Sequence, residues 1–223
     1  MLNTCYEIAA NLKLVFNCNK SKCITFGPGC KLDISDMYLG ASTIKWCHTI
    51  KYLVVTLLSG PRMKVDIDGI KRKFFASCNT ILSNCNGQTE LVRLSLVESY
   101  CLPILQYCCA AYKLSVVQTK ELNACWNMVY RKNFGFSKSE SVTAFICGMG
   151  RLNYKHVIAL AHFKLLKSLC ASSNRVLKTL CATHIVSADF MNLCSEYGVT
   201  LNLSYGGLYR TFVDSFRRLC DFK

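Results

Sequence analysis

The sequence predicts an α+β protein in which a small antiparallel β region is followed by a mainly helical bundle. Before about residue 60, short runs rich in β-branched and aromatic residues alternate with glycine, proline and polar turns. After that point apolar residues recur near the helical period. With 223 residues and 52% hydrophobic content, the chain can bury a sizeable core. We expect a β-rich region at 1–60, a helical region at 61–168 and a C-terminal helical extension at 169–223.

The β-rich region contains four runs that resemble strands, each bounded by a turn. The sequence "GPG" separates the second run from the third, and polar residues separate the others. The predicted strands are "KLVF" at 13–16, "KCITF" at 22–26, "STIKW" at 42–46 and a longer run at 49–58.

The helical region begins after "GPRM", where Ile67, Ile70, Phe74, Cys78, Ile81 and Cys85 recur near the helical period. Pro103 breaks what would otherwise be one long helix, because proline lacks the backbone N–H that a helix interior needs. Further helices are predicted at 89–101, 103–114, 117–131, 138–147, 154–170, 174–183 and 207–220.

The chain is strongly basic, with a formal net charge of +14 and a pI near 9.2. Clustered lysine and arginine attract polyanions through long-range fields and counterion release, so nucleic acid is the first candidate partner. A basic surface that serves only solubility is the second interpretation, and composition leaves both open.

The charge is most one-sided between Ser141 and Ala188, where the sequence contains no Asp or Glu. On the predicted helix at 154–170, one face carries Tyr154, Val157, Ile158, Ala161, Leu165 and Leu169. The opposite arc carries Lys155, His156, His162, Lys164 and Lys167. Without local acids these charges favour a track for backbone phosphates, although a solvated helix face explains them as well. We expect Arg151 and Lys155 to matter for binding, and Lys31 and Lys45 to matter little.

Other functional classes find little support in the residues. No apolar stretch reaches the roughly 18 residues that a membrane span needs, and no secretory signal is visible, so we expect an intracellular protein of the cytoplasm or nucleus with no membrane partner. The 16 cysteines then indicate reduced thiols in apolar surroundings. A zinc site is a weak alternative based on Cys181, His184 and Cys194.

Several segments, in order, resemble the reverse transcriptases of non-LTR (LINE-like) retrotransposons. In "NLKLVFNCNKSKCITFG", Asn17, Lys20, Ser21 and Lys22 match the palm segment that follows that family's catalytic aspartate pair. In "TIKYLVVTL", Lys51, Tyr52, Leu53 and Val55 match its K-Y-L-G-V hairpin, the primer grip, with Val54 in place of glycine. Three further stretches, "DIDGIKRKFFASCNTIL", "SLVESYCLPILQYCCAA" and "WNMVYRKNFGFSKSESVTAFICGMGRL", are similar to the thumb.

The resemblance implies a C-terminal piece of such an enzyme, made of the end of the palm (1–60) and a thumb-like region. The full-length family uses Mg²⁺ held by palm aspartates, whereas this chain has no Asp-Asp dipeptide. We therefore expect no cofactor in this chain and no polymerase activity from it alone. The first residues resemble the helix that follows the catalytic pair.

The resemblance also implies roles for individual residues. Lys20 would lie near the phosphates of the incoming nucleotide, and Lys51 and Tyr52 would support the 3′ end of the primer. The full set of predicted nucleic-acid contacts is Lys20, Lys22, Lys51, Tyr52, Lys71, Arg72, Lys73, Arg131, Lys132, Arg151 and Lys155.

The expected partner is RNA or an RNA–DNA duplex, bound without sequence preference. Exposed palm edges would also favour self-association. The alternative is a structural or interaction relic of a mobile element, with no surviving activity.

Overall fold

The structure is a computed structural model that describes residues 2–107, 109, 112, 114–181, 183–200 and 204–221. It divides into two compact units, Met1–Gly69 and Ile70–Lys223. Small sheets come first and helices follow, so the predicted α+β class is confirmed.

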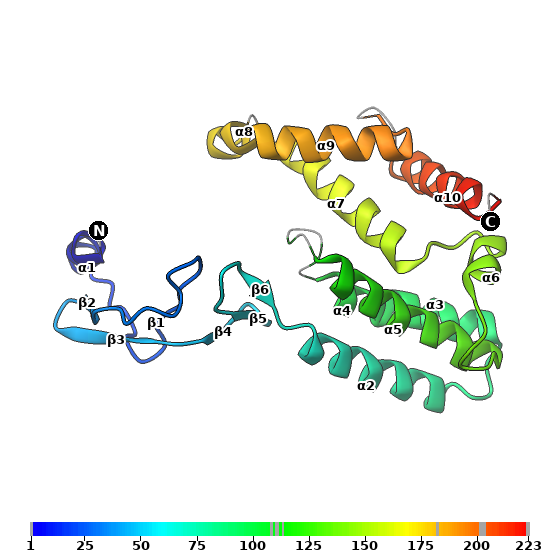
Figure 1. The fold of residues 1–223 in the computed structure, drawn as a ribbon, viewed down its shortest axis with the longest axis horizontal. Helices are drawn as coiled ribbons and strands as arrows, with labels where there is room; N and C mark the ends of the chain where they lie inside the picture. Colours follow the sequence, from blue (N-terminus) through cyan, green and yellow to red (C-terminus); the bar gives the residue numbers. More distant parts are fainter. Residues whose placement is uncertain are drawn as a thin grey trace. The chain divides into compact units, whose positions relative to one another are not determined.

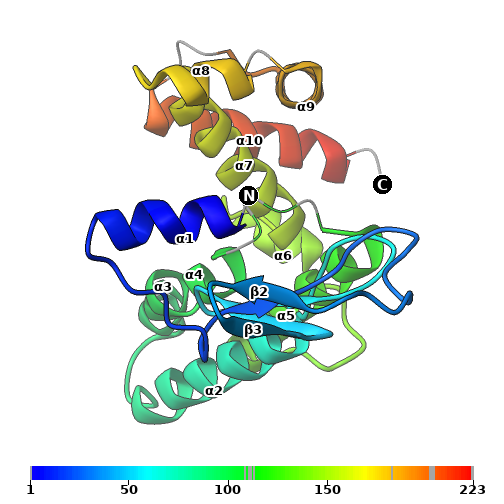
Figure 2. The ribbon, with the colours of Figure 1, turned by 90° about the vertical axis from the view of Figure 1, so that its left-hand side faces the viewer.

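The first unit opens with helix α1 (Leu2–Asn11), which covers a three-stranded sheet (Figure 2). The sheet has the order β1 (Lys22–Cys23), β3 (Ser42–Trp46), β2 (Met37–Leu39). Strands β2 and β3 are antiparallel, which agrees with the antiparallel β region expected, whereas β1 pairs with β3 in parallel. Neither β2 nor the parallel pairing was predicted from the sequence.

A second sheet in this unit contains a hairpin of β4 (Thr49–Tyr52) and β5 (Val55–Leu58), and β6 (Lys64–Val65) pairs with β5. The run at 49–58 is therefore two strands, as the hairpin in the resemblance implies. Residues Leu53 and Val54 form the two-residue turn between them. Strand β6 was not predicted, because two residues are too few to show an alternating pattern.

The predicted strand at 13–16 is wrong. Lys13 has a left-handed φ of 57° directly after α1, and residues 14–17 belong to no strand. A β-type composition forms a strand only where a neighbouring strand completes its hydrogen bonds. No strand of the described residues pairs with this segment.

The second unit is helical, and its predicted helices are largely confirmed (Figure 1). The helix predicted at 138–147 begins later, at Thr143, and α9 was not predicted. The helix predicted at 103–114 ends at Gln106, and residues 108, 110, 111 and 113 lie outside the described residues. The helices are α2 (Asp68–Asn84), α3 (Glu90–Tyr100), α4 (Leu102–Gln106), α5 (Val116–Phe134), α6 (Thr143–Gly148), α7 (Tyr154–Cys170), α8 (Arg175–Cys181), α9 (His184–Tyr197) and α10 (Tyr205–Asp221).

Local sequence explains several of the helix boundaries. The hydroxyl of Ser115 accepts a hydrogen bond from the backbone N–H of Gln118, whose side chain accepts one from the backbone N–H of Ser115, so α5 starts with a capping box. Gly135 ends the same helix with a φ of 72°, a conformation that glycine adopts without a steric penalty. Thr89 and Asn153 cap α3 and α7 through their side-chain oxygens.

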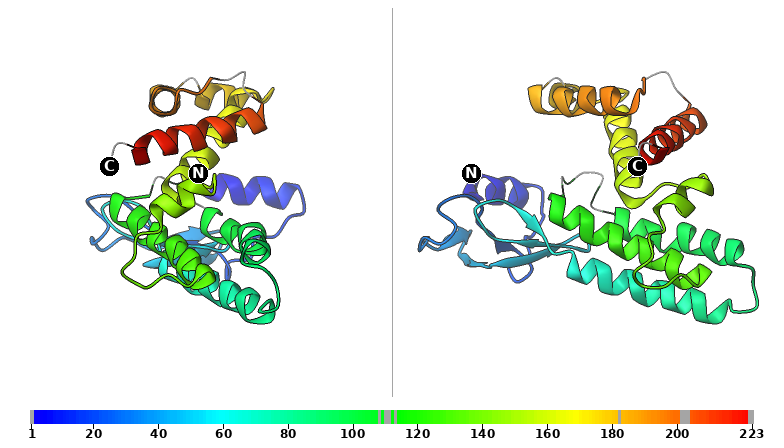
Figure 3. Two further views of the ribbon diagram at one scale, coloured as in Figure 1. Left: turned by 90° about the vertical axis from the view of Figure 1, so that its right-hand side faces the viewer. Right: turned by 45° about the vertical axis from the view of Figure 1, so that its right-hand side comes forward.

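Helix α7 links two packed groups of helices in this unit, α2–α5 on one side and α8–α10 on the other (Figures 1 and 3). Phe74 of α2 contacts Trp126 of α5, and Tyr197 stacks on Phe212 with ring centroids 4.2 Å apart. Because α7 packs against α5, α8, α9 and α10, its buried residues extend beyond the predicted face to His156, Leu160, Phe163 and Leu166. No helix of the described residues is both long and apolar enough to span a membrane, and the cellular compartment stays a prediction.

Candidate nucleic-acid interface

The three consecutive cations of α2 face in different directions. Lys71 Nζ lies 2.7 Å from the carboxylate oxygen Oε2 of Glu121 on α5, in a half-buried ion pair. Phe74, one turn further on, is fully buried against Trp126. This side of α2 therefore holds the helix against α5, and Lys71 is committed to that contact.

Arg72 and Lys73 point the other way and are exposed. Within the part of the chain that the structure describes, neither forms an ion pair or a side-chain hydrogen bond. They are the two predicted contacts of the helical unit whose charges have no partner there, so they are available to an anionic ligand.

Lys132 extends the basic surface of α2 on the neighbouring helix α5. Its Nζ donates a 3.0 Å hydrogen bond to Oδ1 of Asn79, seven residues after Arg72. Seven residues are about two helical turns, or about 10 Å, so Arg72 and Asn79 share one face of α2. Lys132 remains exposed and keeps its charge, since its partner is neutral. We call Arg72, Lys73 and Lys132 the α2–α5 basic surface.

Arg131 has a structural role at the end of α5. Its Nε donates a 2.9 Å hydrogen bond to the backbone carbonyl of Glu140. The bond fixes the segment after Gly135 and leaves Arg131 only partly exposed.

Arg151 lies in a polar cluster between three helices. It forms a 3.1 Å ion pair with Glu98 of α3, and its side chain is 38% exposed while that of Glu98 is 19% exposed. Burial raises the pKa of the Glu98 carboxyl, and the charge of Arg151 opposes that rise. Burial also raises the pKa values of Tyr130 and Tyr209, which lie beside this pair. Arg151 therefore has an acidic partner, Glu98, which lies outside the acid-free stretch 141–188.

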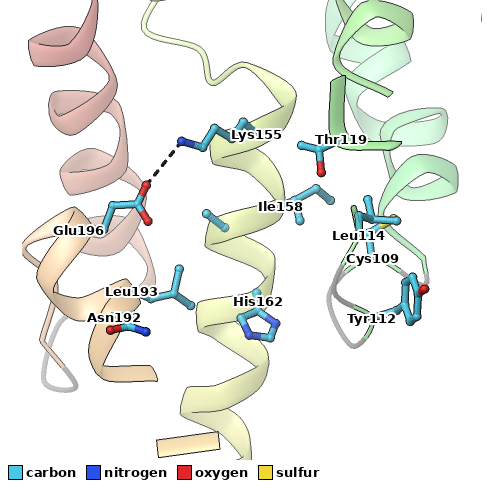
Figure 4. Close-up of a pocket in the computed structure, with 11 residues that line it drawn as sticks. Cys109, Tyr112, Leu114, Thr119, Lys155, Ile158, His162, Asn192, Leu193 and Glu196 are labelled. Carbon is cyan, nitrogen blue, oxygen red and sulfur yellow. Dashed lines mark ion pairs between the residues drawn. The ribbon is translucent and has the colours of Figure 1, made fainter. Parts of the chain in front are cut away.

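Lys155 also has an acidic partner, Glu196 of α9, at 3.5 Å. Figure 4 shows this pair beside a pocket of about 330 Å³ whose lining includes Ile158, His162 and Leu193. Both partners are more than half exposed, so solvent screens the interaction and Lys155 can still contact an anion. Arg151 precedes α7, which begins at Tyr154, so Arg151 and Lys155 do not lie on the same helix.

His156 was predicted on the polar arc of α7 but is buried. Its Nδ1 lies 2.5 Å from Oδ1 of Asn153, and its ring contacts Tyr197 and Phe216. Burial, and secondarily the charge of Lys155, lowers the pKa of His156 to about 4. The imidazole is therefore neutral at physiological pH and contributes packing rather than charge.

In the first unit, the predicted contacts lie on turns and strands. The backbone N–H of Lys20 donates to the carbonyl and side-chain oxygens of Asn17, which closes the turn before β1 and leaves the lysine side chain exposed. Lys22 lies on β1 directly opposite Lys45 of β3. Lys45, expected to matter little, is thus the immediate neighbour of a predicted contact.

Lys51 and Tyr52 end β4, next to a strained turn. Leu53 and Val54 have φ values of 44° and 75°, in the left-handed region that side chains with a Cβ rarely adopt. Two-residue hairpin turns commonly require this conformation and favour glycine or asparagine. By the resemblance, Val54 adds bulk where the family's glycine leaves room for close approach. The structure adds a second effect of this residue, because the position has a left-handed φ, and Val54 is more than half exposed.

Sequence reasoning missed the acidic partners because they lie far away in the chain. Glu121, Glu98 and Glu196 are each separated from their cations by at least 41 positions, and periodicity carries no information about such pairs. The glutamates themselves sit on predicted or observed helices, but nothing in their local sequence identifies the partner. The pairing of Lys22 with Lys45 was likewise hidden by the unpredicted parallel register.

The weak zinc alternative receives no geometric support. The side chain of His184 lies outside the described residues, and among the described ones no three His, Cys, Asp or Glu side chains form a group able to hold a metal ion. Cys181 and Cys194 are free thiols.

Comparison with protein-family models, curated protein sequences and solved structures finds no match for this chain.

Proposed function

We propose that this protein binds nucleic acid through backbone phosphates without reading its sequence, as a reverse-transcriptase-like palm and thumb would. The observation that carries the proposal is the α2–α5 basic surface. Two of its three cations have no intramolecular partner among the described residues, and the third has a neutral one. Unpaired cations on rigid helices favour phosphate contacts, because their charge is not already neutralised by the fold.

The order of the elements supports the reverse-transcriptase resemblance behind this proposal. A helix, a small three-stranded sheet, a hairpin and a helical bundle follow one another, which fits the end of a palm followed by a thumb. The hairpin turn adds a second argument. The family motif has glycine at the position that corresponds to Val54. The backbone of Val54 has a positive φ, which glycine adopts without a steric penalty, so the turn fits the glycine of the motif. The RNA or RNA–DNA duplex expected from the resemblance is the partner that we propose.

The test compares two double charge reversals in the full chain. Arg72→Glu/Lys73→Glu removes the free cations of α2, and Arg175→Glu/Lys178→Glu removes two exposed cations of α8. All four side chains are exposed, so neither double change removes a packed side chain from the core. Fluorescence anisotropy with labelled duplexes of unrelated sequence, over a series of salt concentrations, gives the affinities.

We expect wild-type affinity to fall steeply with salt and to vary little with sequence. The change in α2 should weaken binding uniformly and reduce the slope of log affinity against log salt by about 2, one for each phosphate that the variant no longer neutralises. The change in α8 should have a smaller effect. Equal reductions in affinity from both would show that only total charge matters, and absence of binding would reject the proposal.

The alternative function, an interaction or structural protein, is favoured by one specific observation. Segment 12–16 of the first unit exposes Leu12, Leu14 and Val15, the last with 95% of its surface accessible. Apolar residues exposed together in this way mark an interaction surface. Concentration-dependent self-association in the ultracentrifuge without nucleic-acid binding would support this alternative.

A further inference from the structure

The β1–β3–β2 sheet has one covered and one open face. On one face Leu39 and Ile44 are buried, and helix α1 packs against strand β2 (Figure 2). The contact with α1 is tight at Gly40, where a Cβ atom would lie 2.6 Å from the ring of Tyr6. This face is therefore part of the small core of the unit and is closed to ligands.

Strand register identifies the residues of the opposite face. Tyr38 is the partner of Thr43, and Lys22 is the partner of Lys45. Partner residues project from the same face, as do residues two apart along a strand, so these four side chains share one face. All four are exposed, and Tyr38 has 53% of its surface accessible.

The two lysines of this face are an unfavourable pair for folding. Neighbouring strands lie about 4.8 Å apart, and like charges directly opposite each other destabilise a sheet. Among the described residues, neither lysine forms an ion pair, and Asp33 and Asp36, in the loop before β2, form none either. An anion held between the two ammonium groups would relieve the repulsion, and such a site would bind a phosphate.

Tyr38 provides a different kind of contact on the same face. Its side chain is exposed next to Thr43 rather than packed in an apolar cluster. Exposed aromatic rings on open sheets stack with the unpaired bases of single strands. The bases of a duplex are already paired and stacked, so the duplex would have to open before one of them could stack on the ring. Thr43 and Lys45 are two positions apart along β3, about 7 Å, so the Tyr38 ring and the lysine pair lie close enough to contact neighbouring nucleotides of one nucleic-acid strand.

We propose that the open face of the β1–β3–β2 sheet binds single-stranded nucleic acid, with an unpaired base stacked on Tyr38 and an adjacent phosphate between Lys22 and Lys45. The proposal rests on the proposed function and deepens it. It assigns Lys45 and Tyr38 to binding, and it specifies single-stranded nucleic acid as the ligand of this face.

The test of the lysine pair uses the full chain and a labelled oligothymidylate as the single-stranded probe. Lys22→Gln/Lys45→Gln removes both charges together with their mutual repulsion, so it should leave the protein folded while lowering affinity at low salt by about tenfold. The matched control is Lys13→Gln/Lys31→Gln, which removes two exposed lysines of the same unit that lie outside the sheet. We expect the control to lose at most a small part of that affinity.

The test of stacking compares Tyr38→Ala with Tyr38→Phe. Alanine should lower affinity for the single strand by about fivefold or more, and phenylalanine should retain most of it, because stacking requires the ring and not the hydroxyl. Neither change should alter affinity for a duplex.

Two results would overturn this inference while leaving the proposed function in place. The first is an equal fall in affinity for the sheet and control lysine variants, and the second is an unchanged affinity for the single strand in Tyr38→Ala. In both cases the α2 variant Arg72→Glu/Lys73→Glu would still weaken duplex binding. If the wild-type protein binds neither probe, the proposed function fails together with the inference.

Discussion

A cation contributes to binding only to the extent that the fold leaves its charge free. Arg72 and Arg151 are the same residue type in the same unit, and both were predicted to contact phosphates. Arg72 is exposed and without an acidic partner among the described residues, whereas Arg151 compensates the half-buried carboxylate of Glu98. The first is a candidate ligand contact, and the second stabilises the junction of α3 with the segment before α7.

We predict that Arg151→Ala destabilises the protein by about 1–3 kcal/mol at neutral pH, because it leaves the Glu98 carboxylate buried without a cation. The free energy of unfolding from urea titration measures the effect. Burial already raises the pKa of Glu98, so the folded protein protonates this carboxylate at a higher pH than the unfolded chain does. The destabilisation should therefore become smaller as the pH falls and Glu98 becomes neutral.

Lys155→Ala is the matched control for this prediction. It removes a cation from an ion pair in which both side chains are more than half exposed, so stability should change by less than about 1 kcal/mol. Adding Glu98→Gln to Arg151→Ala should restore part of the stability, since the uncompensated charge is then absent. A destabilisation by Arg151→Ala that is independent of pH, or one matched by Lys155→Ala, would contradict the assigned role.

At the scale of elements, the hairpin β4–β5 shows a conflict between residue type and backbone conformation. We predict that Val54→Gly stabilises the protein by about 0.5–1 kcal/mol. Relief of the left-handed strain of a β-branched residue, about 1–2 kcal/mol, should exceed the entropy cost of glycine in the unfolded chain. The midpoint of thermal unfolding of the first unit measures the gain.

Val55→Gly is the control for the hairpin, because it makes the same substitution one residue later, where β5 is paired with β4. There glycine removes side-chain packing and relieves no positive φ, so the protein should become less stable. If both glycine variants destabilise the protein to the same extent, the turn carries no strain that glycine can relieve.

The elements also show what the sequence could predict. Helices α2 and α7 were found because their apolar residues repeat at the helical period over 17 positions. Segment 13–16 has an equally clear β-type composition but forms no strand, because strand formation depends on a partner that composition does not reveal. The same limit explains the candidate site. The exposure of Arg72 and Lys73 follows from the buried face of α2, whereas the partners of Lys71 and Arg151 depend on how distant helices pack.

At the scale of the whole molecule, net charge overstates the surface available to a polyanion. Of the seven cations predicted to bind in the helical unit, five are engaged by acids, an amide or a backbone carbonyl. The other two, Arg72 and Lys73, are exposed and have no partner among the described residues. A count of Lys and Arg therefore identifies a class of partner, and the tertiary contacts decide where that partner can bind.

The buried apolar core is also unequally divided between the two units. In the described part of the first unit, the buried apolar residues are Ala9, Leu39, Ile44, Val65 and Ile67, whereas the helical unit buries many more, including Trp126 and Phe163. Resistance to local opening grows with the apolar surface that opening would expose. We therefore expect the first unit to open more readily than the second.

Hydrogen exchange measured by mass spectrometry tests this expectation in the intact protein. Backbone amides in peptides from residues 2–69 should exchange faster than those from α5 and α7, which are long helices with buried faces. The comparison of α1 with α7 is the sharpest, since both are helices and only Ala9 is buried in α1. Equal protection of these two helices would show that the small core of the first unit is as resistant to opening as the large one, and would contradict the expectation from burial.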